Sequence, residues 1–333
     1  MTQSSTENQP AAAAERLDVE PLDPAIDSIQ PGGGICMRIE LGWGRLRRWY
    51  LKTFRRGYLR RMAETRRGDP EGCPHEVLDP RDVKFHRNRI DCSWDPADDP
   101  FTWRDRIPLA RAGLAELIIM GGLCLAFTIL AAWLYWPVSF VPAAIGLFFV
   151  WFFRDPRRVV PQDEGFVVSP ADGKVVEIEE IPHHDYVGGP AVKIGIFLSV
   201  FNVHINRAPV AARVIGLTYR RGKFLNAMRP ESAKENEQMA VRLEENAPPH
   251  RRLIVRQITG AIARRIVCWI SPGEDLERGA QFGMIKLGSR TELVLPREPG
   301  LVIDVRAGDH VRAGKSVMAR YGAVAENDPP AAN

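Results

Sequence analysis

The step from Gly288 to Ser289 places two groups side by side that can react with each other. It lies inside the run from Phe282 to Pro296, between two stretches with the alternation of β-strands. Glycine offers an unhindered carbonyl and accepts backbone angles closed to other residues, so the serine hydroxyl can approach that carbonyl from unusual directions. Serine is a weak nucleophile at its own pKa, and such an attack needs a base nearby. A Gly-Ser pair on its own is more often a turn, so both interpretations stay open at this point.

The cysteines indicate neither a disulfide framework nor a metal centre. Their number is odd, they are widely scattered, and no two have the spacing of a metal-ligand pair. The sequence therefore predicts that the protein binds no metal. The five are Cys36, Cys73, Cys92, Cys124 and Cys268.

A long uncharged run predicts a pair of apolar helices. No charged side chain occurs from Leu117 to Phe153. At about 1.5 Å per residue, the part up to Tyr135 spans nearly 30 Å, the thickness of the apolar layer of a bilayer. A proline then interrupts the run, and we predict a transmembrane or membrane-embedded helical hairpin over residues 109–155. Arginines flank both ends, which by the positive-inside rule places both tails in the cytoplasm. A buried helical pair in a soluble core is the alternative.

Residues 36–108 form an Arg-rich extension ahead of this hairpin. Between Arg45 and Arg67 the only acid is Glu64, so this part suits a surface that bears phosphates, either nucleic acid or anionic lipid. The pattern predicts a basic amphipathic helix on a membrane surface, or else a solvated helix that packs its aromatic stripe on the main domain. The stripe recurs at every fourth position, as Leu46, Tyr50, Phe54, Tyr58 and Met62.

The two ends of the chain carry no pattern that predicts packed structure. Residues 1–35 are rich in Ala, Pro, Gly, Ser and acids and show little apolar periodicity. We expect a disordered tail there and a second one over residues 324–333.

Residues 156–323 predict a compact domain rich in β-strand, because short apolar runs alternate with Gly, Pro, Asn or charged turns. The run from Val305 to Gly322 resembles the closing hairpin of a biotinyl or lipoyl-type barrel-sandwich fold. The predicted fold class is therefore mainly β (α+β), with a barrel-sandwich-like domain preceded by the helical hairpin.

Several motifs, in one order along the chain, resemble those of phosphatidylserine decarboxylases, and in particular the short Gly-Ser-Arg branch of that family. The resemblance covers roughly residues 117–323, so the first 108 residues read as an extension. The motifs are Phe153-Arg-Asp-Pro-Arg157, Ser169-Pro-Ala-Asp-Gly-Lys-Val175, Phe201-Asn-Val-His-Ile-Asn-Arg-Ala-Pro209, Gly222-Lys-Phe-Leu-Asn-Ala227, Glu235-Asn-Glu237 and the run from Phe282 to Leu295.

This resemblance implies that the protein cuts itself between Gly288 and Ser289. Ser289 would attack the Gly288 carbonyl to give an ester, and elimination followed by hydrolysis would turn the serine into a covalent pyruvoyl cofactor. His204 and Asp172 occupy the family positions of the base and of the group that orients it.

Three further residues are candidates for contacts to the substrate head group. The longer bacterial branch of the family typically has a second histidine where this chain has Arg207, so Arg207 is a candidate to hold a phosphate or carboxylate. Lys174 and Lys223 are candidates for the same role, with surface solvation as the alternative for each.

The activity implied by the resemblance is decarboxylation of phosphatidylserine to phosphatidylethanolamine and CO₂, through a Schiff base with the pyruvoyl group. The implied enzyme sits at the cell membrane with its catalytic domain on the cytoplasmic side. Its large and small chains stay associated, it binds no nucleic acid, and a homo-oligomer is left open. One alternative is a decarboxylase of another seryl phospholipid, of the archaetidylserine type. A second is a membrane-tethered biotinyl- or lipoyl-like binding module, but the sequence shows no carrier lysine motif for it.

Overall fold

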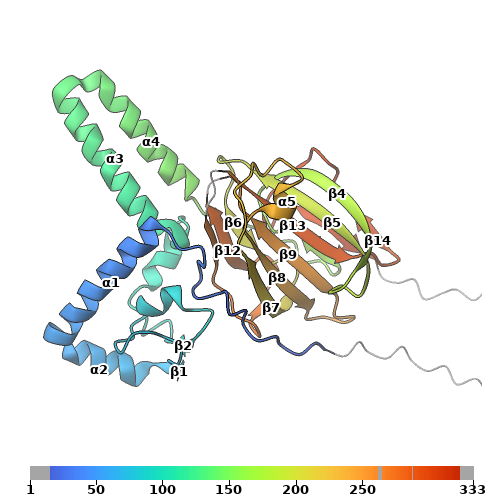
Figure 1. Ribbon diagram of the computed structural model, residues 1–333, viewed down its shortest axis with the longest axis horizontal. Coiled ribbons are helices and arrows are strands. Elements are labelled where there is room, and N and C mark those ends of the chain that lie inside the picture. Colours follow the sequence, from blue (N-terminus) through green and yellow to red (C-terminus); the bar gives the residue numbers. More distant parts are fainter. Residues whose placement is uncertain (1–15, 262–264, 287, 323–333) are drawn as a thin grey trace, which may run out of the picture.

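The computed structural model describes residues 16–261, 265–286 and 288–322. A β-rich body carries most of the second half of the chain, and helices from the first half project from one end of it (Figure 1). The prediction of a mainly β fold with a preceding helical region is confirmed at this level.

The body is built around a large antiparallel sheet. Its strands are β4 (Gly173–His184), β5 (Gly189–Leu198), β7 (Ala212–Arg220), β8 (Gln238–Glu245), β9 (Arg252–Ile258), β11 (Asp275–Leu276), β13 (Ser289–Pro296) and β15 (His310–Val311). Among the described residues the order is β11-β7-β8-β9-β13-β5-β4-β15, and each neighbouring pair is antiparallel. Successive side chains of a strand face opposite sides, so alternate apolar residues of these strands meet in one core. The strand that begins at Ser289 therefore lies inside the sheet, between β9 and β5.

Two three-stranded sheets complete the body. One contains β3 (Phe166–Val168), β14 (Leu301–Ile303) and β16 (Val317–Tyr321), and the other contains β6 (Ile205–Arg207), β10 (Arg265–Cys268) and β12 (Gln281–Lys286). Val167 and Met318 of the first sheet are buried in the same core as the large sheet. The second sheet carries the residues just after His204 and those just before Gly288. A one-turn helix, α5 (Ser232–Glu235), lies between β7 and β8 in the chain.

The run from Val305 to Gly322 differs from the expected closing hairpin. β15 pairs with β4, whereas β16 pairs with β14 and β3, so the run is divided between two sheets. Tight turns that contain glycines at positive φ, Gly308 at 106° and Gly314 at 68°, lie on either side of β15. These turns let the chain leave one sheet after two paired residues and enter the other.

The predicted helical hairpin is present as two antiparallel helices that lie side by side (Figure 1). They are α3 (Leu114–Tyr135) and α4 (Phe140–Phe152), joined by the 3₁₀ turn η4 (Trp136–Ser139) and preceded by η3 (Arg111–Gly113). The stretch Arg111–Phe152 is long and apolar enough to cross a membrane, and none of its most apolar window is buried inside the molecule.

The extension before the hairpin folds into helices and short irregular elements. These are α1 (Ile35–Phe54), α2 (Arg56–Thr65), β1 (Arg67–Asp69), η1 (Asp82–Phe85), β2 (Asp91–Ser93) and η2 (Thr102–Arg106). The single predicted amphipathic helix is broken at Arg55, whose φ of −128° and ψ of 41° are not helical. The break separates the stripe: Leu46, Tyr50 and Phe54 are exposed on α1, whereas Met62 is buried on α2.

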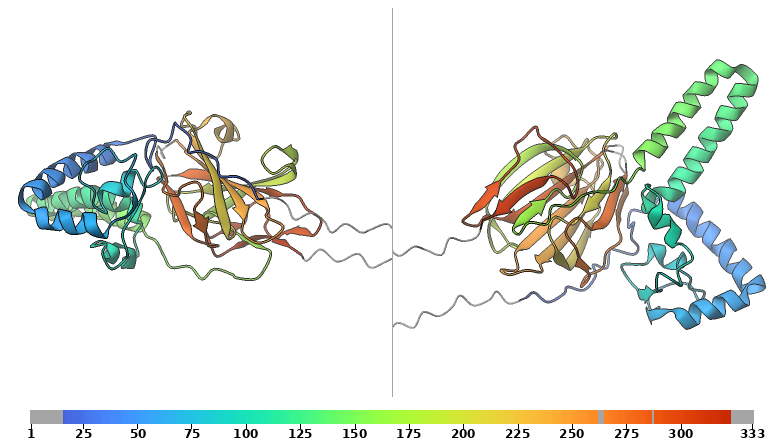
Figure 2. Two further views of the ribbon diagram at one scale, coloured as in Figure 1. Left: turned by 90° about the horizontal axis from the view of Figure 1, so that it is seen from below. Right: turned by 180° about the vertical axis from the view of Figure 1, so that it is seen from behind.

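Residues 16–34 differ from the expected disordered tail, because they lie along the body (Figure 2). The Glu20 N–H donates to the Ile215 carbonyl at 2.8 Å, and the Tyr219 N–H donates to the Asp23 carboxylate at 2.9 Å. Ile26 is buried in the main core. Backbone pairing and a few well-placed apolar side chains thus order a segment whose composition is polar. The remaining tail predictions, residues 1–15 and 324–333, lie outside the described residues.

Candidate active site

Ser289 is the first residue of β13, and its side chain is fully buried on the core side of the sheet. Among the described residues its hydroxyl oxygen has no hydrogen-bond partner. Gly288, just before it, has a φ of 64°, in the left-handed region that favours glycine. At the step predicted to react, a buried hydroxyl without a hydrogen-bond partner therefore follows a glycine whose backbone conformation few other residues adopt.

His204 lies beside this step and is held by the backbone on both ring nitrogens. Its Nδ1 is 2.8 Å from the Asn202 carbonyl oxygen, and the Gly288 N–H donates to its Nε2 at 3.3 Å. A carbonyl can only accept, so the proton is on Nδ1 and the lone pair is on Nε2. Burial lowers the pKa of His204 to about 4, because desolvation disfavours the imidazolium. At neutral pH the structure thus holds an unprotonated imidazole nitrogen against the Gly288–Ser289 step.

The end of the hairpin forms one wall of the His204 site. The Phe152 ring lies 4.4 Å from the His204 ring, centroid to centroid. Arg154 donates to the carbonyls of Phe201 and Trp151, both at 2.8 Å, and its charge also lowers the pKa of His204. His204 is therefore packed directly against the junction of hairpin and body.

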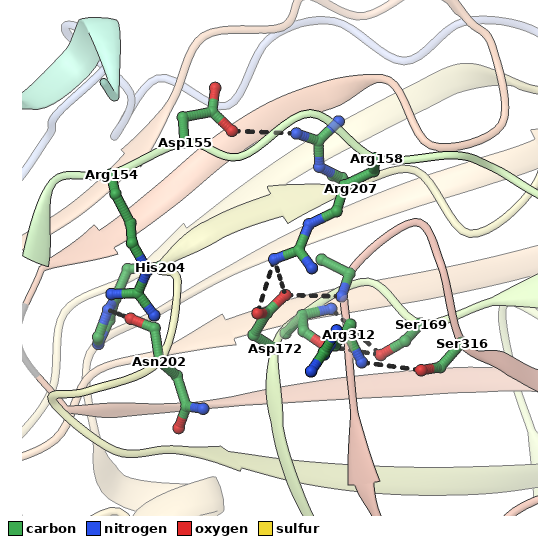
Figure 3. A network of polar contacts seen from close by, with 12 residues as sticks. Arg154, Asp155, Arg158, Ser169, Asp172, Asn202, His204, Arg207, Arg312 and Ser316 are labelled. Carbon is green, nitrogen blue, oxygen red and sulfur yellow. Dashed lines mark hydrogen bonds and ion pairs between the residues drawn. The ribbon is translucent and has the colours of Figure 1, made fainter. Parts of the chain in front are cut away.

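Asp172 does not orient His204 as the sequence predicted. Its carboxylate accepts from Arg158 at 2.8 and 3.0 Å and from the Ala313 N–H at 2.8 Å. Figure 3 shows Asp172 directed toward Arg158, while His204 is bonded to Asn202. The orienting acceptor is thus a backbone carbonyl two residues before the histidine. Burial raises the pKa of Asp172, an effect that the Arg158 charge opposes.

Arg207 is buried in an ion pair rather than presented to a ligand. It donates to the Asp155 carboxylate at 3.1 Å and to the Gly279 carbonyl at 3.0 Å (Figure 3). Gln281 of β12 donates to the other oxygen of Asp155 at 2.6 Å. Asp155 thereby connects the end of the hairpin to both β6 and β12.

The two predicted lysine contacts lie apart from this cluster. Lys223 is exposed and pairs with Glu235 at 2.7 Å. Lys174 is an exposed residue of β4 that pairs with Phe197 of β5 and with His310 of β15. Neither contacts the network around His204 and Gly288 in any interaction that the described residues show.

A row of charged side chains fixes the strand that follows Ser289. Arg290 is only 2% exposed and donates to Glu292 at 2.9 Å and to Glu177 of β4. Glu292 also pairs with Arg256 of β9 at 2.8 Å. Because these pairs reach β9 on one side and extend past β5 to β4 on the other, they hold the start of β13 in register.

A cavity of about 260 Å³ opens where the hairpin meets the body. Phe149 and Phe152 of α4 and Met120 of α3 line its apolar side, and Lys286 and Arg265 line its polar side. Lys286 is two residues before Gly288 and pairs with Glu116 at the start of α3. The cavity shares Phe152 with the His204 site, so an elongated amphipathic molecule in it would lie next to that site.

Sequence reasoning did not single out Asn202, Arg158 or Lys286. Asn202 lies inside a motif that was used, but its role depends on its backbone carbonyl, which no side-chain pattern reveals. Arg158 directly follows another motif. Lys286 lies within the run around the reactive step, and its position next to the hairpin follows only from the fold.

These residues can bring about an acyl shift. A serine hydroxyl, the adjacent glycine carbonyl and an unprotonated imidazole are the groups that such a shift needs. Within the part of the chain that the structure describes, no three His, Cys, Asp or Glu side chains form a group that could hold a metal ion.

Comparison with known proteins agrees with this chemistry. The phosphatidylserine decarboxylase family model matches residues 145–319. A phosphatidylserine decarboxylase proenzyme of Rhodopirellula baltica is 53% identical over 239 residues, which are 72% of this chain and 99% of that protein. Proenzymes of Carboxydothermus hydrogenoformans and Symbiobacterium thermophilum are 42% and 43% identical, over 65% and 60% of this chain and 98% and 91% of their own lengths. The chain belongs to the phosphatidylserine decarboxylase family and is a decarboxylase made as a proenzyme.

Proposed function

We propose that this protein decarboxylates phosphatidylserine to phosphatidylethanolamine, and that it first cuts itself between Gly288 and Ser289 to make its cofactor. The observation that carries the proposal is the contact of His204 Nε2 with the Gly288 N–H, next to the free hydroxyl of Ser289. The relatives are named as proenzymes of this activity.

The self-cleavage is an exchange of a peptide bond for an ester. The Ser289 oxygen bonds to the Gly288 carbonyl carbon, and the bond from that carbon to the Ser289 nitrogen breaks. Once the Gly288 N–H releases His204 Nε2, this nitrogen takes the hydroxyl proton and returns a proton to the departing nitrogen, which becomes an amine. Loss of the Ser289 α-proton then expels the Gly288 carboxylate and leaves dehydroalanine. Water replaces the nitrogen of that residue, which leaves as ammonia, and a pyruvoyl group remains.

The surroundings of residue 289 fit such a group. The Ser289 hydroxyl has no protein partner to lose among the described residues, and Arg290 holds the strand that follows. A pyruvoyl ketone supplies an electron sink for the carbanion that remains when an amino acid loses CO₂. The buried His204 is placed to hold or move a proton on the same side of the chain.

In this proposal Asp172 and Arg207 have structural roles and do not contact the reacting atoms. Asp172 fixes Arg158, and Arg207 fixes Asp155, so both attach the segment after the hairpin to the body. Lys286 and Arg265 at the cavity are better placed than Lys174 and Lys223 to meet an anionic head group that enters beside Phe152.

We further propose that the α3–α4 hairpin is embedded in the cell membrane and holds the body at the cytoplasmic face. Its large apolar side chains are exposed, among them Ile129 at 63% and Leu147 at 70%. α1 begins at the hairpin base and carries an exposed stripe of Trp43, Tyr50 and Phe54, which suits the headgroup region of an anionic bilayer. The body is barrel-sandwich-like in this proposal, since its first three-stranded sheet packs on the core of the large sheet.

Intact-mass analysis of the purified protein tests the self-cleavage. We expect two chains that meet at residues 288 and 289, the smaller lighter than a serine-started chain by one ammonia. Ser289→Ala should remain uncut and inactive, whereas the control Ser93→Ala, at an exposed serine of β2, should be cut like the natural sequence. An uncut natural chain that still releases CO₂ from phosphatidylserine would overturn the proposal. Release of CO₂ from phosphatidylserine, compared with release from an ether-linked seryl lipid of the archaetidylserine type, decides between the two lipid substrates.

A further inference from the structure

The carbonyl of the peptide bond that would be cut lies against Gly260, two residues after the end of β9. A Cβ placed on Gly260 would sit 2.4 Å from the Gly288 carbonyl oxygen and 3.3 Å from its carbon. The separation from the oxygen is shorter than non-bonded atoms accept, and the separation from the carbon is a tight contact. The φ of Gly260 lies outside the left-handed region, so its backbone conformation is open to other residues. The contact with the Gly288 carbonyl is therefore what calls for glycine at this position.

Gly260 cannot easily move away from that carbonyl, because Thr259 before it is held on two sides. The Thr259 N–H and hydroxyl both donate to the Glu237 carbonyl, at 3.0 and 3.1 Å. The Asn236 side-chain amide donates to the Thr259 carbonyl at 2.7 Å. All of the Thr259 backbone polar groups thus have partners in the segment that leads into β8.

Asn236 connects the same point to the loop that precedes α5. Its side-chain oxygen accepts from the Leu225 N–H at 2.8 Å, and its amide donates to the Leu225 carbonyl at 2.9 Å. Ala227 of this loop would lie 3.2 Å from a Cβ on Gly260. Asn236 is fully buried. Two family motifs, 222–227 and 235–237, therefore meet behind Gly260, although neither contributes a group that could react with Ser289.

We propose that Gly260, fixed by Asn236 and Thr259, is a positioning residue for self-cleavage. Its missing side chain leaves room for the Gly288 carbonyl at the place where the Ser289 hydroxyl can reach its carbon. Attack on a carbonyl requires the reacting atoms about 3 Å apart and aligned, and a shift of about 1 Å can slow such a reaction about a hundredfold. This inference rests on the proposed cut between Gly288 and Ser289.

The test is the rate at which purified precursor is cut, followed by gel and by mass. Gly260→Ala should be cut at least about tenfold more slowly, because the added methyl displaces the Gly288 carbonyl. Gly189→Ala is the matched control: Gly189 begins β5, has no atom within 4 Å of an added Cβ and has no left-handed φ. It should be cut at the natural rate.

Hydroxylamine shows which step is slowed, because it cleaves an ester but leaves the peptide bond intact. If Gly260 positions the first attack, the ester does not accumulate in Gly260→Ala and hydroxylamine releases no extra small chain. A variant blocked only after ester formation would be cut rapidly by the reagent. Rapid hydroxylamine cleavage of Gly260→Ala would therefore contradict a positioning role in the first step.

A second variant decides the question if Gly260→Ala does not fold. Thr259→Val keeps the side-chain shape and removes only one of the two bonds to the Glu237 carbonyl, which still accepts from the backbone N–H. We expect several-fold slower cutting at an unchanged melting temperature. Natural-rate cutting of both folded variants would overturn the inference, whereas a natural chain cut elsewhere, or not at all, would instead overturn the proposed function.

Discussion

His204 shows how much of the site depends on one buried side chain. An imidazole in water is partly protonated near neutral pH, but this ring is 1% exposed and its Nδ1 proton is committed to a backbone carbonyl. Desolvation therefore keeps Nε2 unprotonated across the physiological range, and there it accepts from the Gly288 N–H. Within the described part of the chain no carboxylate is bonded to the ring, and burial is the main cause of the unprotonated imidazole.

The rate of self-cleavage should report this depressed pKa. Because the pKa of His204 is lowered to about 4, the ring is neutral above that pH, and the cutting rate should be flat from about pH 5 to pH 8. It should fall as the pH drops through about 4. Rates of precursor cutting at a series of pH values check this, and a midpoint near 6.5 would contradict a buried base.

The same shift has a consequence for stability, with a definite sign. Between pH 6.5 and about 4 the unfolded chain binds a proton at His204 that the folded chain does not. Protonation then favours the unfolded state, so this residue makes stability fall as the pH is lowered through that window. His204→Gln should remove this contribution to the pH dependence of the melting temperature and should also prevent cutting.

At the scale of elements, the segment after α4 joins the hairpin to the body. Arg154 bonds to the loop before His204, Asp155 pairs with Arg207 of β6, and Arg158 pairs with Asp172 before β4. A hairpin attached in this way cannot tilt without moving the wall of the His204 site. The hairpin and His204 are thus parts of one junction.

The Asp155–Arg207 pair should contribute to stability. Arg207→Met leaves the partly buried Asp155 carboxylate without its cation and should cost about 3 kcal/mol in the free energy of unfolding. Arg207→Met combined with Asp155→Asn should cost less than the sum of the two single changes. Arg320→Met, which removes a half-exposed pair with Asp304, is the control and should cost less than about 1 kcal/mol. Denaturant unfolding measures all four, and additive costs would contradict the coupling.

Charges placed on the hairpin should release the protein from membranes. Arginine at Ile129 and at Leu147 faces outward from α3 and α4, and each costs roughly 3 kcal/mol at the centre of a bilayer. The double variant should move from the sedimented membrane fraction to the supernatant. Val302→Arg, at a half-exposed valine of β14, should leave the distribution unchanged. Continued sedimentation of the double variant would argue for a hairpin outside the apolar layer.

At the scale of the whole molecule, the cut would divide the chain within its main sheet. Residues from 289 onward supply β13, β14, β15 and β16, and β13 is bonded to β9 on one side and to β5 on the other. The small chain is therefore held by backbone pairing on both sides and by the shared core. A cut at this point opens the backbone without opening the sheet.

The two chains should consequently remain together until the protein unfolds. Native mass measurement should give both chains in one particle, and denaturant should separate them. The melting temperature of the cut protein should rise with protein concentration, since its unfolding releases a second chain, whereas that of uncut Ser289→Ala should not. Loss of the small chain on dilution without denaturant would contradict this arrangement.

The sequence by itself determined the features that lie in local order along the chain. Uncharged length predicted the α3–α4 hairpin, alternation predicted the strands, and the ordered motifs pointed to Ser289 and His204 and to the family. Tertiary structure alone decided the contacts between distant segments: Asn202 in place of Asp172 as the acceptor for His204, Arg207 in an ion pair with Asp155, and Gly260 against the Gly288 carbonyl. The physical reason is that periodicity and motif order record which face of an element is apolar and which residue types are present. Backbone carbonyls, close approaches and burial arise only when separate strands meet, and they set both the pKa of the base and the position of the bond to be cut.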